Sequence, residues 1–345
     1  MANRRASITD LAKALNLSTS TISRALADHH DVSEATKKRV RALAEELSYQ
    51  PNQLAAALRR GRTNTLGVLV PHITGHFFPQ VVNGIATEAA RLGFNVMICQ
   101  SNEDVKQERK NIDLLMNSQV EGILVSLANT TKDFGHFEAV RSQNVPLVFF
   151  DRVVEGFRGD NVSAVMLDDY QGAYQVVDHL LEQGCTRIAH FTGPLHINIH
   201  KGRHQGYLDA LKAHGVPVDN QLIIIGELNQ KTGAAYMRKL IKQDRRVDAI
   251  FASNDLAAVG ALQEAKAHGL RVPQDLAIAG FSNEPFTTLV EPQLTTVDQG
   301  CDTMGISAVR LLQKMLAGNP DRQMQPRNVV LKPKLFVRES TLKKK

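Results

Sequence analysis

The chain of 345 residues is long enough for two or three domains, and no apolar run reaches the ~18 residues that a membrane-spanning helix needs. Its polar, basic first ten residues predict no secretory signal, and three scattered cysteines are typical of a reducing cytoplasm. The net charge is +6, but residues 1–62 hold eleven lysines and arginines against six acidic residues, and the rest hold thirty against twenty-nine. A small basic module on a nearly neutral body indicates a polyanionic partner, with DNA as the first candidate, although a solvated basic end would give the same pattern.

Two short helices are predicted near the start, over 8–15 and 19–26. Thr9 is the expected N-cap of the first helix, Asn16 suits the left-handed conformation of a tight turn, and Ser18 can cap the second helix. Two short helices joined by about three residues form the frame of a helix-turn-helix, whose second helix faces base edges in the major groove. The outward face of that second helix offers Thr19, Ser20, Ser23 and Arg24.

A third helix is predicted from its N-cap Ser33 to Leu47. Its basic side consists of Lys37, Lys38, Arg39 and Arg41. Pro51 then ends this region, and residues 53–60 form a short alanine-rich stretch. Because helices of this length are marginal in water, we expect the stretch to become helical only when two copies pack together on DNA.

Three stretches carry a specific pattern, namely Ile8-Thr9-Asp10-Leu11-Ala12, the run from Ser18 to Arg24, and Tyr49, Pro51, Asn52, Ala55 and Leu58. Together they resemble the DNA-binding headpiece of the lactose-repressor (LacI/GalR) family. The resemblance implies that Thr19, Ser20 and Arg24 read bases, and that 52–60 is a hinge helix whose Leu58 is wedged into the minor groove. The candidate DNA-binding residues are Thr9, Ser18, Thr19, Ser20, Thr21, Ser23, Arg24, Asn52, Ala55 and Leu58. Since Thr19 and Ser20 are small, we expect Arg24 and DNA shape to carry more of the specificity.

Beyond Gly61, apolar strands alternate with amphipathic helices, which predicts parallel sheets covered on both faces. The predicted strands are 66–70, 94–99, 122–127, 146–150, 164–167, 187–191, 222–225, 249–252 and 276–280, and the helices include 78–92, 105–117, 170–183, 203–214 and 255–268. Nine strands are many for one such sheet, so we expect two lobes. The expected crossings between the lobes lie near 160–162, 291–292 and 320–326.

This part of the chain is similar to the family's effector domain, a two-lobed fold shared with periplasmic sugar-binding proteins. The expected fold class is therefore α/β, with an all-α helix-turn-helix headpiece and a two-lobed effector domain built on parallel sheets. The expected domains are 1–50 for the headpiece, 51–62 for hinge helix and linker, and 63–340 for the effector domain. Its first lobe is expected over 63–161 and 293–325, and its second lobe over 162–292 and 326–340.

Polar residues gather at the carboxyl ends of the predicted strands, where ligands bind on parallel sheets. Carboxylates, amides, a forked contact from Arg203 and an aromatic ring at Phe77 suit a sugar-like ligand between the lobes. The resemblance assigns Asp151, Arg203, Asn254 and more weakly Gln299 to the ligand, whereas Ser282 stands where the family commonly has Asp. The candidate effector-binding residues are His76, Phe77, Asp151, His196, Asn198, Arg203, Asn254, Asp255, Ser282 and Gln299. Any one of them alone could instead be a loop residue that satisfies nearby backbone groups.

His196, His200 and His204 recur every four residues, and three interpretations stay open. On a helix they would share one face at metal-ligand spacing; they could also line the pocket or lie on the surface. The loop-forming Gly193-Pro194 before His196, and the lack of a nearby cysteine or carboxylate, disfavour a metal. We therefore expect neither a metal nor a cofactor.

The sequence thus predicts a transcription repressor that binds palindromic double-stranded DNA as a homodimer and is controlled allosterically by a small sugar-like effector. We expect it in the cytoplasm, associated with the nucleoid when bound to DNA, and without a membrane partner. A periplasmic ligand-binding protein is the main alternative, disfavoured by the missing signal and by residues 8–60. A sugar-processing enzyme lacks a catalytic motif, since Asp168 and Asp169 suit helix capping better than acid–base work. The effector's identity, the direction of its effect and activation of some promoters stay open.

Overall fold

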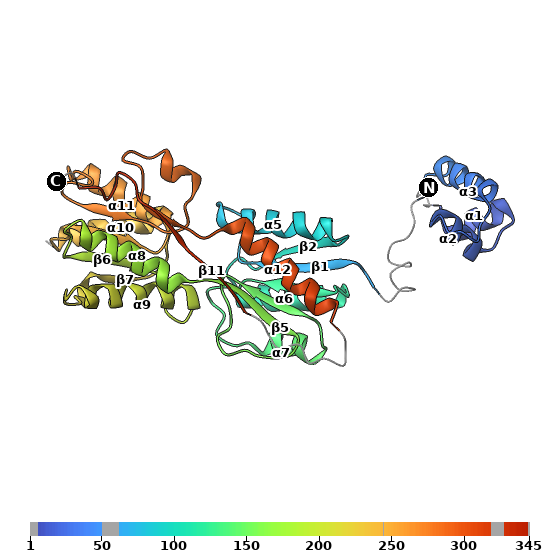
Figure 1. The fold of residues 1–345 in the computed structure, drawn as a ribbon, viewed down its shortest axis with the longest axis horizontal. Helices are drawn as coiled ribbons and strands as arrows, with labels where there is room; N and C mark the ends of the chain where they lie inside the picture. The colour runs from blue at the N-terminus through green and yellow to red at the C-terminus, as the bar shows by residue number, and fades with distance from the viewer. Residues whose placement is uncertain (1–5, 50–61, 244, 319–327, 344–345) are drawn as a thin grey trace. The chain divides into compact units, whose positions relative to one another are not determined.

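The computed structural model describes residues 6–49, 62–243, 245–318 and 328–343, and the chain divides into two compact units, Met1–Thr63 and Asn64–Lys345 (Figure 1). The first unit is all-helical, with α1 (Ile8–Leu15), α2 (Thr19–Leu26) and α3 (Glu34–Glu46). The second unit is built on parallel sheets. None of the helices in the described part of the chain is long and apolar enough to cross a membrane.

The helix-turn-helix prediction is confirmed at the turn and wrong at the first cap. Asn16 ends α1 in the left-handed conformation, with φ of 52°, and the Ser18 side chain caps α2 by accepting the Thr21 backbone N–H. The N-cap of α1 is Ser7 and not Thr9, because Ser7 forms a reciprocal capping box with Asp10. That box satisfies two backbone N–H groups at once, which a cap inside the first turn cannot do.

The first sheet has six strands in the order β11-β5-β4-β3-β1-β2, all paired in parallel. Its strands are β1 (Thr65–Val70), β2 (Asn95–Gln100), β3 (Gly122–Val125), β4 (Leu147–Phe150), β5 (Val162–Leu167) and β11 (Val329–Leu331). One face packs against α5 (Phe77–Arg91) and α12 (Cys301–Leu316), and the other against α6 (Val105–Asn117) and α7 (Gly135–Ser142). Because both faces are covered, the strands read as nearly continuous apolar runs.

The second sheet has four parallel strands in the order β7-β6-β8-β9. Its strands are β6 (Ile188–Thr192), β7 (Ile223–Ile225), β8 (Ala249–Ala252) and β9 (Ala277–Ala279). The covering helices are α8 (Asp169–Glu182) and α9 (Asn198–Ala213) on one face, and α10 (Gln230–Lys242) and α11 (Asp255–Ala267) on the other. A short antiparallel pair, β10 (Thr296–Asp298) with β12 (Lys334–Phe336), and two 3-10 turns, η1 (Asn220–Leu222) and η2 (Pro285–Thr288), complete the unit.

All nine predicted strands are present, but the expected crossings between the lobes are corrected. β5 pairs with β4 in the first sheet, so the chain leaves this lobe after Leu167 and not near 160–162. The segment before β5 is a surface turn, and the backbone of a buried strand needs paired neighbours inside the sheet. The other crossings follow β10, before α12 packs on α5, and follow β11, before β12.

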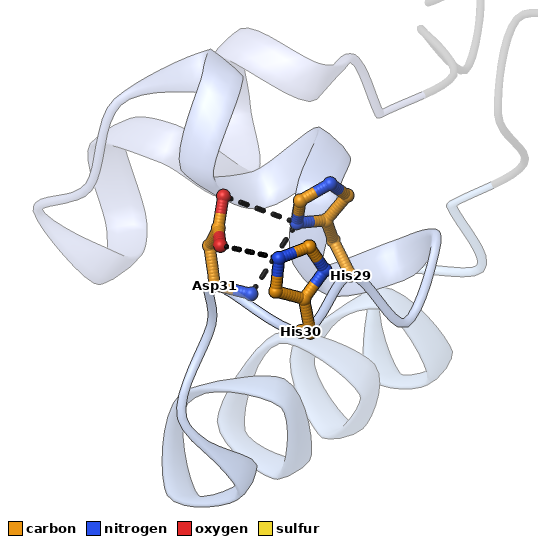
Figure 2. A group of neighbouring side chains, drawn as sticks. All are labelled: His29, His30 and Asp31. Atoms are coloured by element: carbon orange, nitrogen blue, oxygen red, sulfur yellow. Dashed lines mark hydrogen bonds and ion pairs between the residues drawn. The ribbon is translucent and has the colours of Figure 1, made fainter.

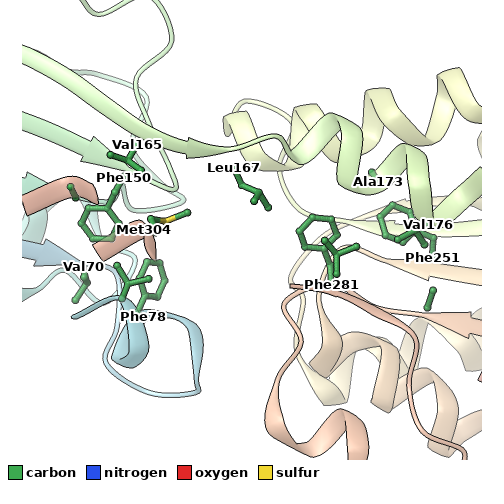
Figure 3. Packing of buried hydrophobic residues seen from close by; sticks show 14 of the residues in the cluster. Val70, Phe78, Phe150, Val165, Leu167, Ala173, Val176, Phe251, Phe281 and Met304 are labelled. Atoms are coloured by element: carbon green, nitrogen blue, oxygen red, sulfur yellow. The ribbon is translucent and has the colours of Figure 1, made fainter. Parts of the chain in front are cut away.

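A continuous buried cluster extends through both lobes (Figure 3). Phe150 and Met304 belong to its part in the first lobe, Phe251 and Phe281 to its part in the second, and Leu167 lies between them at the end of β5. This core holds the carboxyl ends of both sets of strands toward one region, which is where the cavity described below is found.

Candidate functional sites

The exposed face of α2 presents mainly short polar side chains. Ser18 and Thr21 pair their hydroxyl groups with each other at 2.9 Å as part of the helix cap. Thr19 and Ser20 are exposed, as is the Arg24 side chain, which keeps 57% of its surface accessible and lies 3.8 Å from the Asp31 carboxylate. Arg24 is therefore the one long cationic side chain among these candidates. The sequence analysis expected it to contribute more to specificity than Thr19 and Ser20.

The expected basic side of α3 is smaller than the sequence indicated. The side chain of Lys37 is 7% exposed, and its Nζ lies 2.8 Å from Glu34 and 3.1 Å from Asp28. The hydrogen bonds that Lys37 donates to Glu34 and Asp28 raise its pKa, so its charge is paired within the first unit. Arg41 also pairs with Asp28, at 2.7 Å, which leaves Lys38 and Arg39 as the exposed charges of the predicted set that have no ion pair with another described residue.

The loop between α2 and α3 brings together three polar side chains that the sequence interpretation missed (Figure 2). The Asp31 carboxylate lies 3.3 Å from His29 Nδ1 and 2.9 Å from His30 Nε2, and the two rings stack with centroids 4.3 Å apart. One ligand atom from each residue lies within 4.8 Å of the others, a spacing that could hold a metal ion. All three side chains are well exposed, and the cluster's clearest effect is to place an acidic group beside Arg24.

A cavity of about 640 Å³ lies between the two sheets at the carboxyl ends of their strands. Such a volume suits a small ligand. Seven of the ten predicted effector residues line it, namely His76, Phe77, Asp151, Arg203, Asn254, Ser282 and Gln299. The structure also places Glu103, Arg152, His200, Glu227 and Glu284 on its wall, residues not named among the candidates. Glu103 and Arg152 each follow a strand closely, and that position is the signal that could have identified them.

The other three predicted residues, His196, Asn198 and Asp255, do not line the cavity. Their side chains are hydrogen-bonded to other groups of the protein. His196 Nε2 contacts the Asn129 carbonyl at 2.8 Å. Asn198 accepts the Val153 N–H and donates to the Asp151 carbonyl, each at 2.9 Å, and so ties α9 to the end of β4. Asp255 is treated separately, since it is fully buried.

Asp255 accepts the Thr296 hydroxyl at 2.6 Å and the Glu284 backbone N–H at 2.9 Å. Burial raises its pKa to about 7, against the opposing effect of these hydrogen bonds. Asp255 begins α11 and Thr296 lies in β10, so this hydrogen bond holds the start of the helix against the strand.

Arg203 does not offer the forked contact that the sequence suggested. Its Nε donates to Asp169 at 2.7 Å and one Nη to the Ser253 carbonyl at 2.7 Å. The second Nη donates to Gln299 at 3.1 Å, and Gln299 in turn donates to Ser282 at 2.8 Å. The guanidinium also stacks on the Phe281 ring, 3.8 Å from its centroid, so each nitrogen of this buried cation donates to a protein group and its face is covered.

The adjacent carboxylates Asp168 and Asp169 make different interactions. Asp168 caps α8 by accepting the Gln171 N–H at 2.9 Å, whereas Asp169 forms the buried ion pair with Arg203. Their side chains therefore have separate partners, one in a helix cap and one in an ion pair. The capping interpretation is confirmed for Asp168.

Asp151 is the buried carboxylate of the cavity wall, 3% exposed. Its nearest cationic atom is Arg152 Nε at 4.0 Å, beyond hydrogen-bond distance. Burial raises the pKa of Asp151 to about 7, more than the neighbouring arginines lower it. Arg152 donates from Nη1 to both oxygens of Glu103, at 2.8 and 2.9 Å, and to the Leu127 carbonyl at 3.2 Å.

The three histidines at four-residue spacing separate in the structure. His196 precedes α9, as expected from the loop before it, and His200 lines the cavity with its pKa lowered well below the ordinary value by burial. Gly193 is needed opposite His200, because a Cβ there would lie 2.3 Å from the imidazole Nε2. His204 stacks on the buried His190, with centroids 5.6 Å apart. Of the three interpretations, pocket lining holds for His200.

Comparison with known protein families assigns both units. Residues 7–52 match the family model of bacterial regulatory proteins, lacI family, and residues 177–341 match the periplasmic binding protein-like domain. The chain is 31% identical over 334 residues to the ribose operon repressor of Halalkalibacterium halodurans, with 97% of this chain and 96% of the relative covered. It is 33% identical over 313 residues to the transcriptional repressor CytR of Escherichia coli, with 91% and 90% covered.

Solved structures agree in fold. The transcriptional regulator CelR in complex with cellobiose superposes with a TM-score of 0.74 at 30% identity, covering 97% of this chain and all of that chain. The lac repressor dimer bound to operator gives a TM-score of 0.85 at 24% identity, a likeness of fold, with 99% of this chain covered. The helix-turn-helix, the two parallel sheets and these relatives lead to one assignment: the chain belongs to the LacI family of DNA-binding transcription regulators.

Proposed function

We propose that the protein is a transcription repressor that binds a palindromic operator as a homodimer and changes its DNA affinity when a small sugar-like molecule occupies the cavity. The observation that carries this proposal is the cavity wall, which both sheets build at the carboxyl ends of their strands. A ligand held there contacts both lobes at once, so its affinity depends on the angle between them. The proposal is supported by relatives described as a ribose operon repressor and as a cellobiose complex.

On the DNA side, we assign base reading to Thr19, Ser20 and Arg24 on α2, with support from Ser23 on the same face and from Thr9 on α1. Ser18 and Thr21 then act first through the helix cap. The hinge candidates Asn52, Ala55 and Leu58 lie outside the described residues. The hinge and linker at 51–62, and with them the headpiece boundary at residue 50, therefore stay predictions from the sequence.

On the effector side, Asp151 and Asn254 are assigned to direct ligand contacts, and Phe77 to packing on the ligand. Arg203 and Gln299 are assigned to shaping the wall, because their donors are already matched within the protein. We propose binding without a reaction, since Asp168 and Asp169 are committed to a cap and an ion pair. The protein would act in the cytoplasm, on the nucleoid.

The test is a gel-shift titration on a palindromic site with the full chain and with a chain that lacks residues 1–60. We expect tight binding by the full chain and its loss after truncation. Unchanged binding after truncation would contradict the assignment of DNA reading to the first unit. Leu58→Ala should weaken operator binding and leave effector affinity unchanged, whereas normal operator affinity in that variant would remove the minor-groove wedge.

A further inference from the structure

The loop between α2 and α3 holds three consecutive polar side chains whose possible metal ligands converge (Figure 2). His29 Nδ1 lies 3.3 Å from one oxygen of the Asp31 carboxylate, and His30 Nε2 lies 2.9 Å from the other. The two imidazole rings stack on each other, so their nitrogens face the carboxylate from the same side. Among the described residues this is the one group of histidine, cysteine and acidic side chains that converges in this way.

The backbone of this loop is held at both ends. The His29 N–H donates to the Arg24 carbonyl of α2 at 2.9 Å, and the side chain of Val32 is buried in the core of the first unit. Ser33 then caps α3 by accepting the Thr36 N–H. Because an ordered backbone presents the three side chains, less conformational entropy is lost when they gather around a ligand.

The hydrogen bonds of the loop leave two of the possible ligand atoms without a proton between them. The Asp31 backbone N–H donates to His29 Nδ1 at 3.3 Å. An imidazole nitrogen that accepts a hydrogen bond carries no proton, so Nδ1 has none to donate to the Asp31 carboxylate oxygen, which is also 3.3 Å away. Two electron-rich atoms therefore face each other, and a cation bound to both stabilises this arrangement.

The ligand types and their spacing indicate which class of cation fits. Two imidazole nitrogens and a carboxylate oxygen suit zinc, nickel and copper ions, whereas magnesium and calcium prefer oxygen ligands alone. Around a tetrahedral zinc ion with bonds of about 2.0–2.2 Å, ligand atoms lie roughly 3.3–3.6 Å apart. The contact between His29 and Asp31 has this spacing, and all three ligand atoms lie within 4.8 Å of one another, so small side-chain rotations complete the set. The fourth position of the ion stays open to water.

The charges beside the loop decide what a bound ion changes. The neighbouring carboxylate of Asp28 is already paired, with Lys37 at 3.1 Å and Arg41 at 2.7 Å. The Asp31 oxygen that faces the first imidazole also lies 3.8 Å from Arg24 Nη1 on α2. A divalent ion at that oxygen replaces Arg24 as the partner of the carboxylate and repels the guanidinium.

We propose that His29, His30 and Asp31 bind a divalent transition-metal ion of the zinc type, and that the bound ion separates Asp31 from Arg24. The second part rests on the proposed function, in which Arg24 reads bases. An arginine freed from its carboxylate binds the DNA polyanion more tightly, and the ion adds positive charge beside it, so the metal strengthens operator binding. From the sequence we expected no metal, because adjacent histidines share no helix face and their convergence depends on the loop.

The metal site is tested by isothermal titration calorimetry of the full chain, first freed of metal with a chelator, with zinc chloride and with magnesium chloride. We expect zinc to bind at least about tenfold more tightly than magnesium, and His30→Gln to weaken zinc binding by at least about tenfold. The His30 side chain keeps 86% of its surface accessible, so its replacement leaves the fold intact. His214→Gln, which removes another imidazole beside a single carboxylate, is the matched control and should leave zinc binding unchanged. A full chain that binds no zinc, or equal zinc binding by His30→Gln, would overturn the site.

The coupling to Arg24 is tested by gel-shift titration of the full chain on a palindromic site, with zinc and with a chelator. Zinc should tighten operator binding about twofold to fivefold, the range expected when an exposed ion pair is broken. Asp31→Asn should bind the operator as tightly as the zinc-loaded chain and should no longer respond to zinc. Unchanged operator affinity in the zinc-loaded chain would overturn the coupling. Absence of operator binding under both conditions would instead refute the proposed function, because calorimetry measures the metal site independently.

Discussion

Asp151→Asn should stabilise the protein at alkaline pH and leave its stability nearly unchanged at acid pH. The pKa of the Asp151 carboxyl is raised from 3.8 to about 7 by burial. A group whose folded pKa is raised contributes stability that is fully present below its unfolded pKa and is lost as the pH rises through the folded value. For Asp151 that loss falls between about pH 4 and pH 7.

The magnitude follows from the shift of about three units, each worth 1.36 kcal/mol, which gives an upper figure of about 4 kcal/mol for ionising the buried side chain. Asn imitates the protonated acid in shape and cannot ionise. At about pH 3.5, below the unfolded pKa of 3.8, the two proteins should therefore unfold at similar denaturant concentrations, whereas at about pH 8.5 the variant should be more stable by up to about 4 kcal/mol.

The assay is urea unfolding of the full chain and of the variant at these two pH values. Other buried carboxyls such as Asp169 and Asp255 titrate in both proteins, so the difference between the two isolates Asp151. A stability difference that does not change with pH, or a variant that is less stable at pH 8.5, would refute the reasoning. Either result would mean that Asp151 has a donor that the structure does not show.

Asp255→Asn is a contrasting substitution, because the pKa of Asp255 is also about 7 but each of its two oxygens accepts a hydrogen bond. We expect urea unfolding to show a loss of about 1–3 kcal/mol in the free energy of unfolding, since the amide nitrogen of Asn cannot accept a hydrogen bond. Ser7→Ala should cost about 1 kcal/mol in the stability of the first unit, measured by hydrogen exchange in α1, because the capping box is lost. Gly305→Ala should lower the melting temperature, because a Cβ there would lie 2.2 Å from the Val81 carbonyl where α12 crosses α5; an unchanged value would show that the helices can separate at little cost. Arg24→Ala should weaken operator binding in a gel shift by about tenfold or more and leave calorimetric effector binding intact, and the opposite pattern would contradict its assignment to base reading.

Local patterns in the sequence correctly predicted much of the secondary structure. Asn16 and Ser18 predicted the turn and the second cap correctly, because left-handed backbone and capping depend on residues a few positions apart. The nine apolar runs became strands for a similar reason, since strands in the middle of a sheet covered on both faces need continuous apolar residues. The sequence expectation of Thr9 as the first cap was wrong, because Ser7, two residues earlier, accepts the same kind of hydrogen bond and also forms the capping box with Asp10.

What the sequence by itself determined is thus the helix-turn-helix, the alternation of strands and helices, and seven of the residues on the cavity wall. Only the tertiary structure decided that β5 and β11 pair in the first sheet, and that Arg203 is matched by Asp169, Ser253 and Gln299. These partners come from segments far apart along the chain, so no local pattern records them. The partners of Arg203 are therefore fixed by the tertiary structure, because a buried guanidinium donates to the groups that the fold places beside it.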